Sequence, residues 1–527
     1  MALAAFIARF LGLIQRVPLQ NLLGDSGMAT YGIAYNIYSA LLVVATAGIP
    51  SALSKLIADR TALGRHREAA DIFRAATRFA IWTGVFMTIL LFVVAPFYAE
   101  YVAKDPDATL AIRALAPAML IFPLIAIMRG YYQGRQIMIA QGISQIIEQI
   151  LRVLTAVLLA AIFIWLGYGQ ETAAAGASFG GVTGAIGALC VMLWFWLRGR
   201  TEDKPLYTQE QFYYRQSNKA IYKRLFKIAI PISLVSLNAP MIYLIDSSIT
   251  ITLLEGQIGY EAAKESLGIL TGRAQAFAGI APVLAIAIGQ TILPVVSSAY
   301  AQRDMDRVKS QSALALKITL LASLPIVLVL CVAAPAFNGF LFGDRDGSGI
   351  IALLVGSTLF QVVMMATGSI LTGLDKTRLT MRIVLLGIGV KFVLSIILAQ
   401  FFGIYGIVGA TLLGFVFILT LYLTVLRKMI TFQIFTIKQW VILFVASLVL
   451  AAMGYGLQEL LSQIIVTPLG RLNDALIAAI VGIPLLLGYL VIVLRAHLIS
   501  DEDLTYIPTR LQRLLVKVLS IIPRRLR

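Results

Sequence analysis

The side chains of this 527-residue sequence that could do chemistry are ionisable residues placed inside or at the edge of long apolar segments. They are Arg9, Arg16, Lys55, Glu148, Arg152, Asp246, Arg273 and Lys391. A charged side chain at the centre of a bilayer costs about 2.5–3.5 kcal/mol on insertion scales, so each of them needs a partner or a water-filled cavity. The planar guanidinium of arginine can donate two parallel hydrogen bonds to phosphate oxygens. The excess of cations therefore predicts a membrane-embedded site for an anion, with phosphate as the best match.

The cations that we expect to bind substrate come from three segments. Arg9 and Arg16 are seven residues apart in "IARFLGLIQRVP", so they share one face of a helix. Arg273, in "LTGRAQAF", opens an apolar run on the side of the membrane that has few other cations. Lys55 lies at the end of an apolar segment, just before a connection that is rich in basic residues. For each of the four, the alternative is a side chain that extends to the membrane surface and meets water or lipid headgroups there.

The acidic residues within apolar segments, with their basic neighbours, are candidates for gating or ion coupling. Glu148 and Arg152 are four residues apart, in the order that favours an ion pair on one helix, and they could simply neutralise each other. Lys391 follows Glu148 by 243 residues, the spacing of an internal repeat, so these opposite charges could instead face each other between the repeats. Asp246, beside two serines, could hold a coupling cation, pair with an arginine of the first segment or make a polar contact between helices.

Several motifs of enzyme chemistry are absent from the sequence. It contains no G-x-x-x-x-G-K-[ST], H-E-x-x-H or C-x-x-C pattern. The two histidines, His66 and His497, fall in polar connections and do not suggest a metal site. We therefore expect a transporter rather than an enzyme, with no catalytic residue, cofactor or metal. The sequence leaves open whether transport is coupled to a cation, and it does not identify that cation.

The elements that position these residues must be membrane helices. Only 13% of the residues are charged and 59% are hydrophobic, whereas soluble domains have about 25% charged residues. Lipid cannot satisfy open backbone groups, so apolar segments of this length cross a membrane as helices. The sequence predicts an all-α polytopic membrane protein with fourteen transmembrane helices. They cover residues 3–23, 31–56, 77–99, 110–129, 140–166, 174–197, 226–252, 272–299, 313–341, 350–372, 381–402, 405–426, 439–457 and 474–494.

Basic residues in the connections predict the orientation. Most of the 43 lysines and arginines fall in alternate connections and in the tail, while the opposite connections hold only Lys104, Arg113, Lys264, Arg273, Arg345 and Arg471. Cytoplasmic loops are the ones enriched in lysine and arginine, so both termini are expected in the cytoplasm and the protein in the plasma membrane. A net charge of +17 would suggest nucleic acid in a soluble protein, but here the cations follow the membrane pattern and no nucleic-acid partner is expected.

An internal repeat predicts the domain organisation. The stretches "RGYYQGRQIM" and "TGLDKTRLTM" place three residue types 243 positions apart, as Gly130 and Gly373, Arg135 and Arg378, Met138 and Met381. A parallel repeat of six helices puts a substrate site between its halves. We predict an N-lobe at 1–197, a cytoplasmic linker at 198–225, a C-lobe at 226–427, two additional helices at 428–494 and a basic cytoplasmic tail at 495–527.

Three long stretches carry a resemblance to a known family. "YNIYSALLVVATAGIPSALSKLIA", "RGYYQGRQIMIAQGISQIIEQILRV" and "GRAQAFAGIAPVLAIAIGQTILPVVSSAYA" resemble the polysaccharide-flippase branch of the multidrug/oligosaccharidyl-lipid/polysaccharide exporter superfamily. The closest resemblance is to the stage V sporulation protein B-like group of Gram-positive bacteria, which is similar to the lipid II flippases. The family implies two six-helix lobes, alternating access and a cationic central cavity. It matches Arg273 to an arginine of its eighth helix, and Arg9 and Arg16 to arginines of its first.

One segment departs from the family pattern. Where lipid II flippases carry an arginine in the second helix, "LLVVATAGIP" has none, so the implied cavity is less charged. The expected function is translocation of a lipid-linked diphosphate oligosaccharide, lipid II in the first place, with membrane lipids and cell-wall synthesis proteins as expected partners. The alternatives are another undecaprenyl-linked polysaccharide unit, a cation-coupled multidrug exporter and, from a different class, a membrane glycan polymerase.

Overall fold

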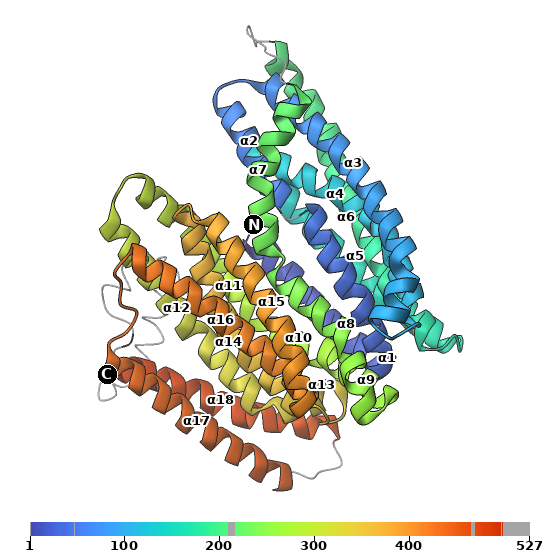
Figure 1. Cartoon of the computed structure of the whole chain (residues 1–527), viewed down its shortest axis with the longest axis vertical. Helices are drawn as coiled ribbons and strands as arrows, with labels where there is room; N and C mark the ends of the chain where they lie inside the picture. Colours follow the sequence, from blue (N-terminus) through green and yellow to red (C-terminus); the bar gives the residue numbers. More distant parts are fainter. Residues whose placement is uncertain (1, 47, 209–216, 465–469, 497, 499–527) are drawn as a thin grey trace. The chain divides into compact units, whose positions relative to one another are not determined.

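The computed structural model describes residues 2–46, 48–208, 217–464, 470–496 and 498. Throughout these residues the regular elements are helices, with two short π-helical turns (Figure 1). Because helices satisfy their own backbone groups, such a chain can lie in lipid. The predicted all-α fold and the multi-pass membrane location are confirmed. Residues 209–216 of the predicted linker and nearly all of the predicted tail lie outside the described residues.

The helices form two compact units that alternate along the chain. The first unit combines residues 1–276 with 377–414, and the second combines 277–376 with 415–527. The elements of the first unit are α1 (Ala2–Thr46), α2 (Gly48–Ala62), α3 (His66–Phe97), η1 (Tyr98–Val102), α4 (Ala108–Gly134), α5 (Met138–Trp165), α6 (Gln170–Thr208), α7 (Asn218–Ser236), α8 (Asn238–Ile258), α9 (Tyr260–Gly268), η2 (Ile269–Ala274) and α15 (Thr377–Phe402). Within it, α3, α4, α5 and α6 pack side by side (Figure 1).

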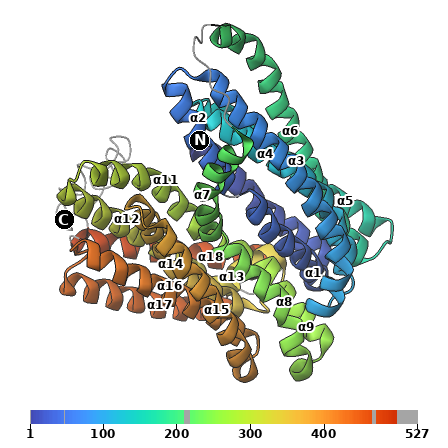
Figure 2. The same ribbon diagram turned by 45° about the horizontal axis from the view of Figure 1, so that its top comes forward.

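The second unit is built from the later helices. Its elements are α11 (Ile280–Ala301), α12 (Met305–Val332), α13 (Ala334–Phe342), α14 (Ser348–Gly373), α17 (Ile437–Ile464) and α18 (Arg471–Arg495). The short α10 (Gln275–Ala278) and the long α16 (Ile404–Met429) pass from one unit to the other. Figure 2 shows α11, α12 and α14 as one packed group, and α18 contacts both α12 and α17.

Two glycines interrupt the first long helical stretch. Gly24 has φ 64° and ψ −173°, a conformation that only glycine adopts at low cost, and it bends α1 in its middle. Gly48 begins α2 directly against the carbonyl of Ala229 in α7, where a side chain would overlap the backbone. The second predicted span therefore consists of the latter part of α1 followed by α2.

The seventh and eighth predicted spans are also broken. The axes of α7 and α8 differ by 50°. Pro240 explains this bend, because it has no N–H to donate to the carbonyl of Ser236 and its ring crowds that carbonyl. The eighth span was expected to be one helix over 272–299, but the structure has η2, α10 and α11 there in succession. Breaks of this kind within spans are typical of transporter binding sites.

Eleven helical stretches within the described residues are long and apolar enough to cross a membrane, or twelve if α7 and α8 form one bent span. The count of fourteen and the division into two lobes, a linker and a tail stay predictions.

Candidate functional site

The first unit contains the intramembrane charges with the most distinctive surroundings. One group lies at the bend of α1. Arg273 of η2 donates to the carboxylate of Asp25 through both Nε, to Oδ1 at 2.9 Å, and Nη2, to Oδ2 at 2.5 Å. The side chain of Gln20 donates to the same Oδ1 at 2.6 Å. Arg273 is therefore a buried arginine in a two-point ion pair that holds the bend of α1 against the π-helical turn.

Arg16 lies in the same region but has no acidic partner. Its Nη1 donates to the backbone carbonyl of Thr271, at 2.6 Å, two residues before Arg273 in the same π-helical turn. Within the described residues no carboxylate forms an ion pair with it. This group contains two arginines, Arg16 and Arg273, and one carboxylate, which Arg273 binds, so it has a positive charge left over.

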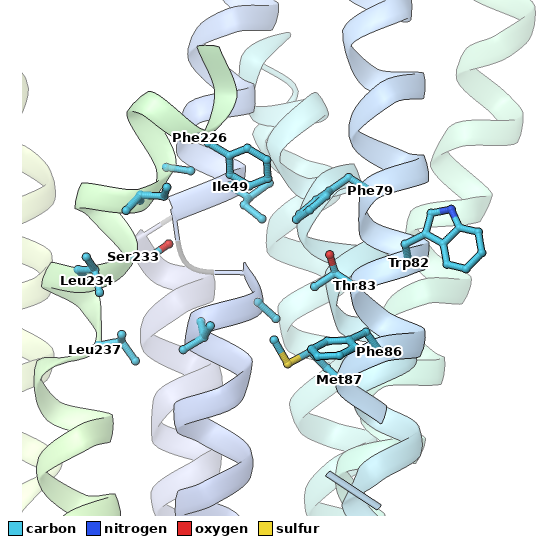
Figure 3. Close-up of a pocket in the computed structure, with 14 residues that line it drawn as sticks. Ile49, Phe79, Trp82, Thr83, Phe86, Met87, Phe226, Ser233, Leu234 and Leu237 are labelled. Carbon is cyan, nitrogen blue, oxygen red and sulfur yellow. The ribbon is translucent and has the colours of Figure 1, made fainter. Parts of the chain in front are cut away.

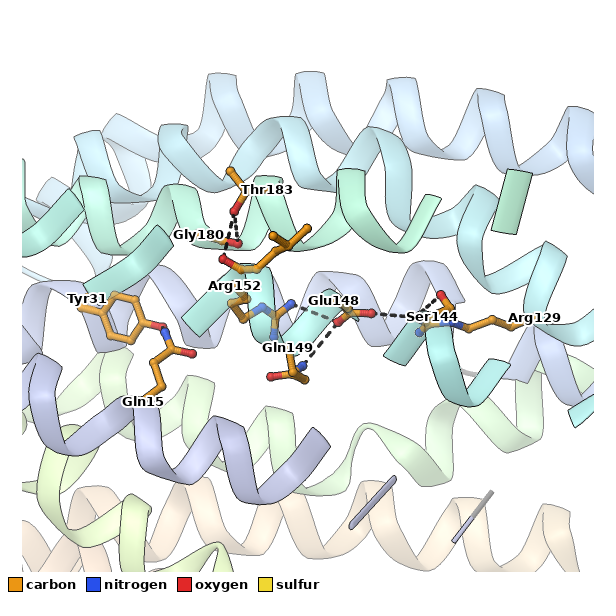
Figure 4. Close-up of polar contacts among 10 residues, drawn as sticks. Gln15, Tyr31, Arg129, Ser144, Glu148, Gln149, Arg152, Gly180 and Thr183 are labelled. Atoms are coloured by element: carbon orange, nitrogen blue, oxygen red, sulfur yellow. Dashed lines mark hydrogen bonds and ion pairs between the residues drawn. The ribbon is translucent and has the colours of Figure 1, made fainter. Parts of the chain in front are cut away.

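A second group joins α4 and α5 (Figure 4). Glu148 Oε2 accepts from Arg129 Nη2 at 2.8 Å, and Glu148 Oε1 accepts from Arg152 Nη2 at 3.4 Å. The i, i+4 pair that the spacing indicates therefore forms. It is joined by Arg129, which also donates to Ser144 Oγ at 2.8 Å. In this group two guanidiniums share one carboxylate.

Arg152 has unused hydrogen-bonding capacity. Its side chain is only 12% exposed, and its Nε has no acceptor in the part of the chain that the structure describes. Three tyrosines of α1, Tyr31, Tyr35 and Tyr38, lie near enough for electrostatic interaction with it. Tyr31 is also close enough to Arg16 to feel its charge, so the two positive groups approach the same stretch of α1.

The third group is neutral overall. Lys391 of α15 donates to Asp246 of α8, and the two side chains are 0% and 2% exposed. Among the described residues, the ion-pair partner of Asp246 is therefore Lys391 and not an arginine of α1, and the contact joins two helices. Lys391 does not face Glu148, which has its own arginines.

A further ion-paired cluster, which the sequence did not suggest, lies beyond the ends of the apolar segments. Lys264 of α9 donates to Asp105 Oδ1 and Asp107 Oδ2, each at 2.8 Å, and Asp105 also accepts from Thr30 at 2.7 Å. Burial alone lowers the pKa of Lys264, but the charge of Asp105 and the hydrogen bonds to both aspartates outweigh it, so the pKa lies above its ordinary value. Burial and the charge of Asp105 raise the pKa of Tyr260 to about 12.

The remaining predicted site residues are less informative. Lys55 is exposed on α2. Arg9 belongs to α1, but its side chain lies outside the described residues. The roles of Arg9, Arg16, Arg273 and Lys55 in substrate binding, and of Asp246, Glu148, Arg152 and Lys391 in gating or coupling, stay predictions.

Sequence reasoning missed the partners Asp25, Arg129, Asp105 and Lys264. Asp25 follows a glycine between two apolar runs and Asp105 sits in a polar loop, so both look like ordinary loop residues. Arg129 stands in the connection after the fourth span, where a cation is expected to be solvated. For Asp25 a sequence signal was available, since aspartate is a preferred N-cap residue at the start of a helix and here follows a glycine between two apolar runs.

The first unit also contains an apolar cavity of about 500 Å³ (Figure 3). Its walls come from α3, from α7 and from the break between α1 and α2. Only Thr83 and Ser233 contribute hydroxyl groups to the lining. The cavity is separate in chemistry from the charged groups above, since no ionisable side chain lines it.

Comparison with known proteins shows which family the chain belongs to. Residues 1–300 match the family model described as "Polysaccharide biosynthesis protein", and residues 231–397 match the MatE family model. The chain is 30% identical to the uncharacterized membrane protein YabM of Bacillus subtilis (strain 168), over 81% of this chain and 78% of that protein. The chain is 25% identical to the lipid II flippase MurJ of the same Bacillus subtilis strain, over 79% of each chain. It is 24% identical to stage V sporulation protein B there, over 87% of this chain and 88% of the relative.

Solved structures agree on the fold. The inward closed conformation of the lipid II flippase MurJ superimposes with a TM-score of 0.66 at 16% identity, covering 92% of this chain and 97% of that one. An inward-facing multidrug resistance MATE family transporter gives 0.63 at 16% identity, covering 81% of this chain and 98% of that one. MurJ is named as a flippase and the MATE protein as a transporter, and together with the family models they confirm that the chain is a transporter and not an enzyme. The chain belongs to the polysaccharide biosynthesis protein family, in the flippase branch of the multidrug/oligosaccharidyl-lipid/polysaccharide exporter superfamily that its motifs resemble.

Proposed function

We propose that this protein translocates a lipid-linked diphosphate oligosaccharide from the inner to the outer leaflet of the plasma membrane, by alternating access. The observation that carries the proposal is the surplus of positive charge within the first unit. Arg16 has no acidic partner among the described residues, and Arg129 and Arg152 share the single carboxylate of Glu148. A surplus cation is costly in a membrane unless an anion arrives to match it.

A diphosphate fits this surplus well. It is compact and multiply charged, and it cannot cross hydrocarbon alone. Arg16 and Arg152 would supply guanidinium donors, and the free Nε of Arg152 would gain the acceptor that it lacks. The hydroxyl of Tyr31, which Gln15 contacts at 3.4 Å, offers a neutral donor beside them. The isoprenoid tail would stay in lipid while the headgroup crosses.

Lipid II is the cargo that we propose first. The similarity to MurJ, named as a lipid II flippase, and to stage V sporulation protein B supports a cell-wall precursor. Another undecaprenyl-linked polysaccharide unit has the same diphosphate and is the nearest alternative. The less charged second helix, "LLVVATAGIP", is the sequence feature that keeps this alternative open. A membrane glycan polymerase finds no support among the relatives.

The driving force follows from the charge of the cargo. Since the sequence has no ATP-binding motif, energy must come from the membrane potential, an ion gradient or consumption of the product. An inside-negative potential favours outward movement of an anion by about 2.3 kcal/mol per charge per 100 mV.

A cation-coupled multidrug exporter is the second candidate. The MatE model match over residues 231–397 and the MATE-like fold favour it. Such an exporter needs an intramembrane carboxylate that can release and bind a cation. Asp246 has Lys391 in that position, and Glu148 and Asp25 are each paired with arginine. These pairings support the anionic cargo.

Reconstitution into liposomes tests the proposal. Labelled lipid II, an undecaprenyl diphosphate carrying a different glycan, and a cationic drug would be offered to the same proteoliposomes. Movement of both lipid-linked substrates with no drug movement supports a lipid-linked diphosphate flippase, and faster movement of lipid II supports the narrower assignment. Drug movement without lipid movement would overturn the proposal.

A further inference from the structure

The apolar cavity of the first unit lies directly below an aromatic contact between α3 and α7. The hydroxyl of Tyr222 donates to the carbonyl of Ala75 at 3.1 Å. Four residues further along each helix, the rings of Phe226 and Phe79 meet edge to face at 4.9 Å. Because the residue number rises by four on both helices between these two contacts, α3 and α7 run in the same direction here. The next turns of the two helices then form the walls of the cavity (Figure 3).

The lining matches a hydrocarbon chain. Phe86 and Met87 of α3, Leu234 of α7 and Leu237 directly after α7 provide most of the next turns (Figure 3). Of the two hydroxyl groups, Ser233 Oγ already accepts from the backbone N–H of Gly48 at 2.9 Å. Pockets for polar small molecules contain several groups that can hydrogen-bond the ligand, and this cavity offers almost none.

The rim of the cavity is exposed where a membrane would surround it. Trp82 is 75% exposed and Ile230 is 52% exposed, although both line the cavity. Both belong to helical segments that are apolar enough to cross a membrane. Chains of the surrounding lipid therefore have access to it. A volume of about 500 Å³ has room for one such chain, but not for a long polyisoprenoid.

Three cations lie one to two turns above the rim. On α3, Arg78 precedes Trp82 by four residues, so both are on one stripe of the helix. On α7, Lys223 and Lys227 precede Ile230 by seven and three residues, which places them on the stripe that enters the cavity. All three are exposed, and within the described ranges none forms an ion pair. Neighbouring cations of α2 and α3 differ, since Arg60, Arg65 and Arg74 pair with Glu68 or Asp71.

We propose that this cavity is a binding site for an anionic phospholipid, with one acyl chain between α3 and α7 and its phosphate among Arg78, Lys223 and Lys227. The apolar cavity is complementary to the acyl chain of such a lipid, and the unpaired basic side chains above it are complementary to the phosphate. Each cation at an anionic membrane surface contributes up to about fivefold in affinity. The site is distinct from the charged groups of α1, α5 and η2 and does not depend on the identity of the transported cargo.

Trp82 provides a probe at the rim. In the full-length protein, Trp165, Trp194, Trp196 and Trp440 would be replaced by phenylalanine, so that Trp82 alone fluoresces. The matched control keeps only Trp165, which is 85% exposed on α5 and lies outside the cavity. Both proteins would be reconstituted with a small fraction of dibrominated phosphatidylglycerol or dibrominated phosphatidylcholine, whose bromine atoms quench tryptophan on contact.

The expected result is at least a tenfold preference of the Trp82 site for phosphatidylglycerol, and no preference at Trp165. The triple variant R78Q/K223Q/K227Q should lose this preference, while the charge-matched variant R427Q/K428Q/K438Q on other helices should keep it. Thr83→Phe, which fills the cavity, should reduce quenching by both lipids. Equal quenching of Trp82 by both headgroups, or a preference that survives the triple variant, would overturn the proposal. Displacement of the brominated lipid by undecaprenyl diphosphate at a lower concentration would also overturn it, because the site would then belong to the cargo.

Discussion

The guanidinium of Arg273 holds the carboxylate of Asp25 by two parallel hydrogen bonds, although the residues are 248 positions apart in the chain. The contact joins the bend of α1 to the π-helical turn η2. Arg16 contacts the carbonyl of Thr271 in the same turn and remains a cation without an acidic partner among the described residues.

Removing one member of the Asp25–Arg273 pair should destabilise the protein. Asp25→Asn and Arg273→Gln should each lower the free energy of unfolding by about 3 kcal/mol, the low end of the range for buried pairs, because the Asp25 side chain is 20% exposed. The double variant should recover most of this loss, since no charge is then left unmatched. Chemical denaturation in detergent would measure all three. Strictly additive losses would contradict the pairing.

The two arginines that contact Glu148 should behave differently. Arg129 donates at 2.8 Å to both Glu148 and Ser144, so Arg129→Gln should cost about 1.5–3 kcal/mol of stability. Arg152 contacts Glu148 only at 3.4 Å, and Glu148 keeps Arg129 when Arg152 is replaced, so Arg152→Gln should cost less stability than Arg129→Gln while slowing transport. Unfolding curves and translocation rates of the same two preparations would show the contrast. A reversed order would mean that Arg152 is the structural partner.

What the sequence could predict depended on how far apart the interacting residues are. The Glu148–Arg152 pair follows from a spacing of four within one helix, so no knowledge of packing was needed. The pairs of Asp25 with Arg273 and of Asp246 with Lys391 join different helices, and periodicity contains no information on which helices meet. Apolar length predicted the membrane helices well. The predicted end of the first span at residue 23 coincides with the bend at Gly24. The bend near Pro240 was missed because a window of mean hydropathy does not register backbone geometry.

The Asp246–Lys391 pair predicts that transport needs no sodium. Because the ammonium of Lys391 already occupies the carboxylate, replacing sodium by choline in the proteoliposome assay should leave the rate unchanged. A rate that falls in choline would indicate a coupling cation at another carboxylate.

The same pair predicts a pattern of stability. Lys391→Met should cost about 3–5 kcal/mol, because it leaves Asp246 buried without a counter-charge. The double variant D246N/K391M should be close to the wild type in unfolding experiments. A single variant as stable as the wild type would show that the pair contributes little.

The raised pKa of Lys264 predicts how the stabilising effect of its ion pairs with Asp105 and Asp107 changes with pH. Its pKa in the folded protein is raised, so its contribution to stability is complete below the unfolded pKa of about 10.4 and is lost as the pH rises through the folded value. The stability difference between the wild type and Lys264→Met should therefore stay constant from about pH 8 to pH 10 and decrease only above that. A difference that decreases already below pH 9 would contradict a raised pKa. Lys309→Met, whose lysine is more exposed and pairs only with Asp306, serves as the control.

The central claim is that Arg16 and Arg152 bind the diphosphate of a lipid-linked cargo during transport. Its most direct test is the translocation rate of labelled lipid II in proteoliposomes that contain wild type, Arg16→Gln, Arg152→Gln, or the exposed control Arg427→Gln. Loss of a charge-assisted hydrogen bond predicts a decrease of about 10- to 100-fold for each of the first two variants, with the control unchanged. Wild-type rates in both Arg16→Gln and Arg152→Gln, at equal amounts of folded protein, would contradict the account.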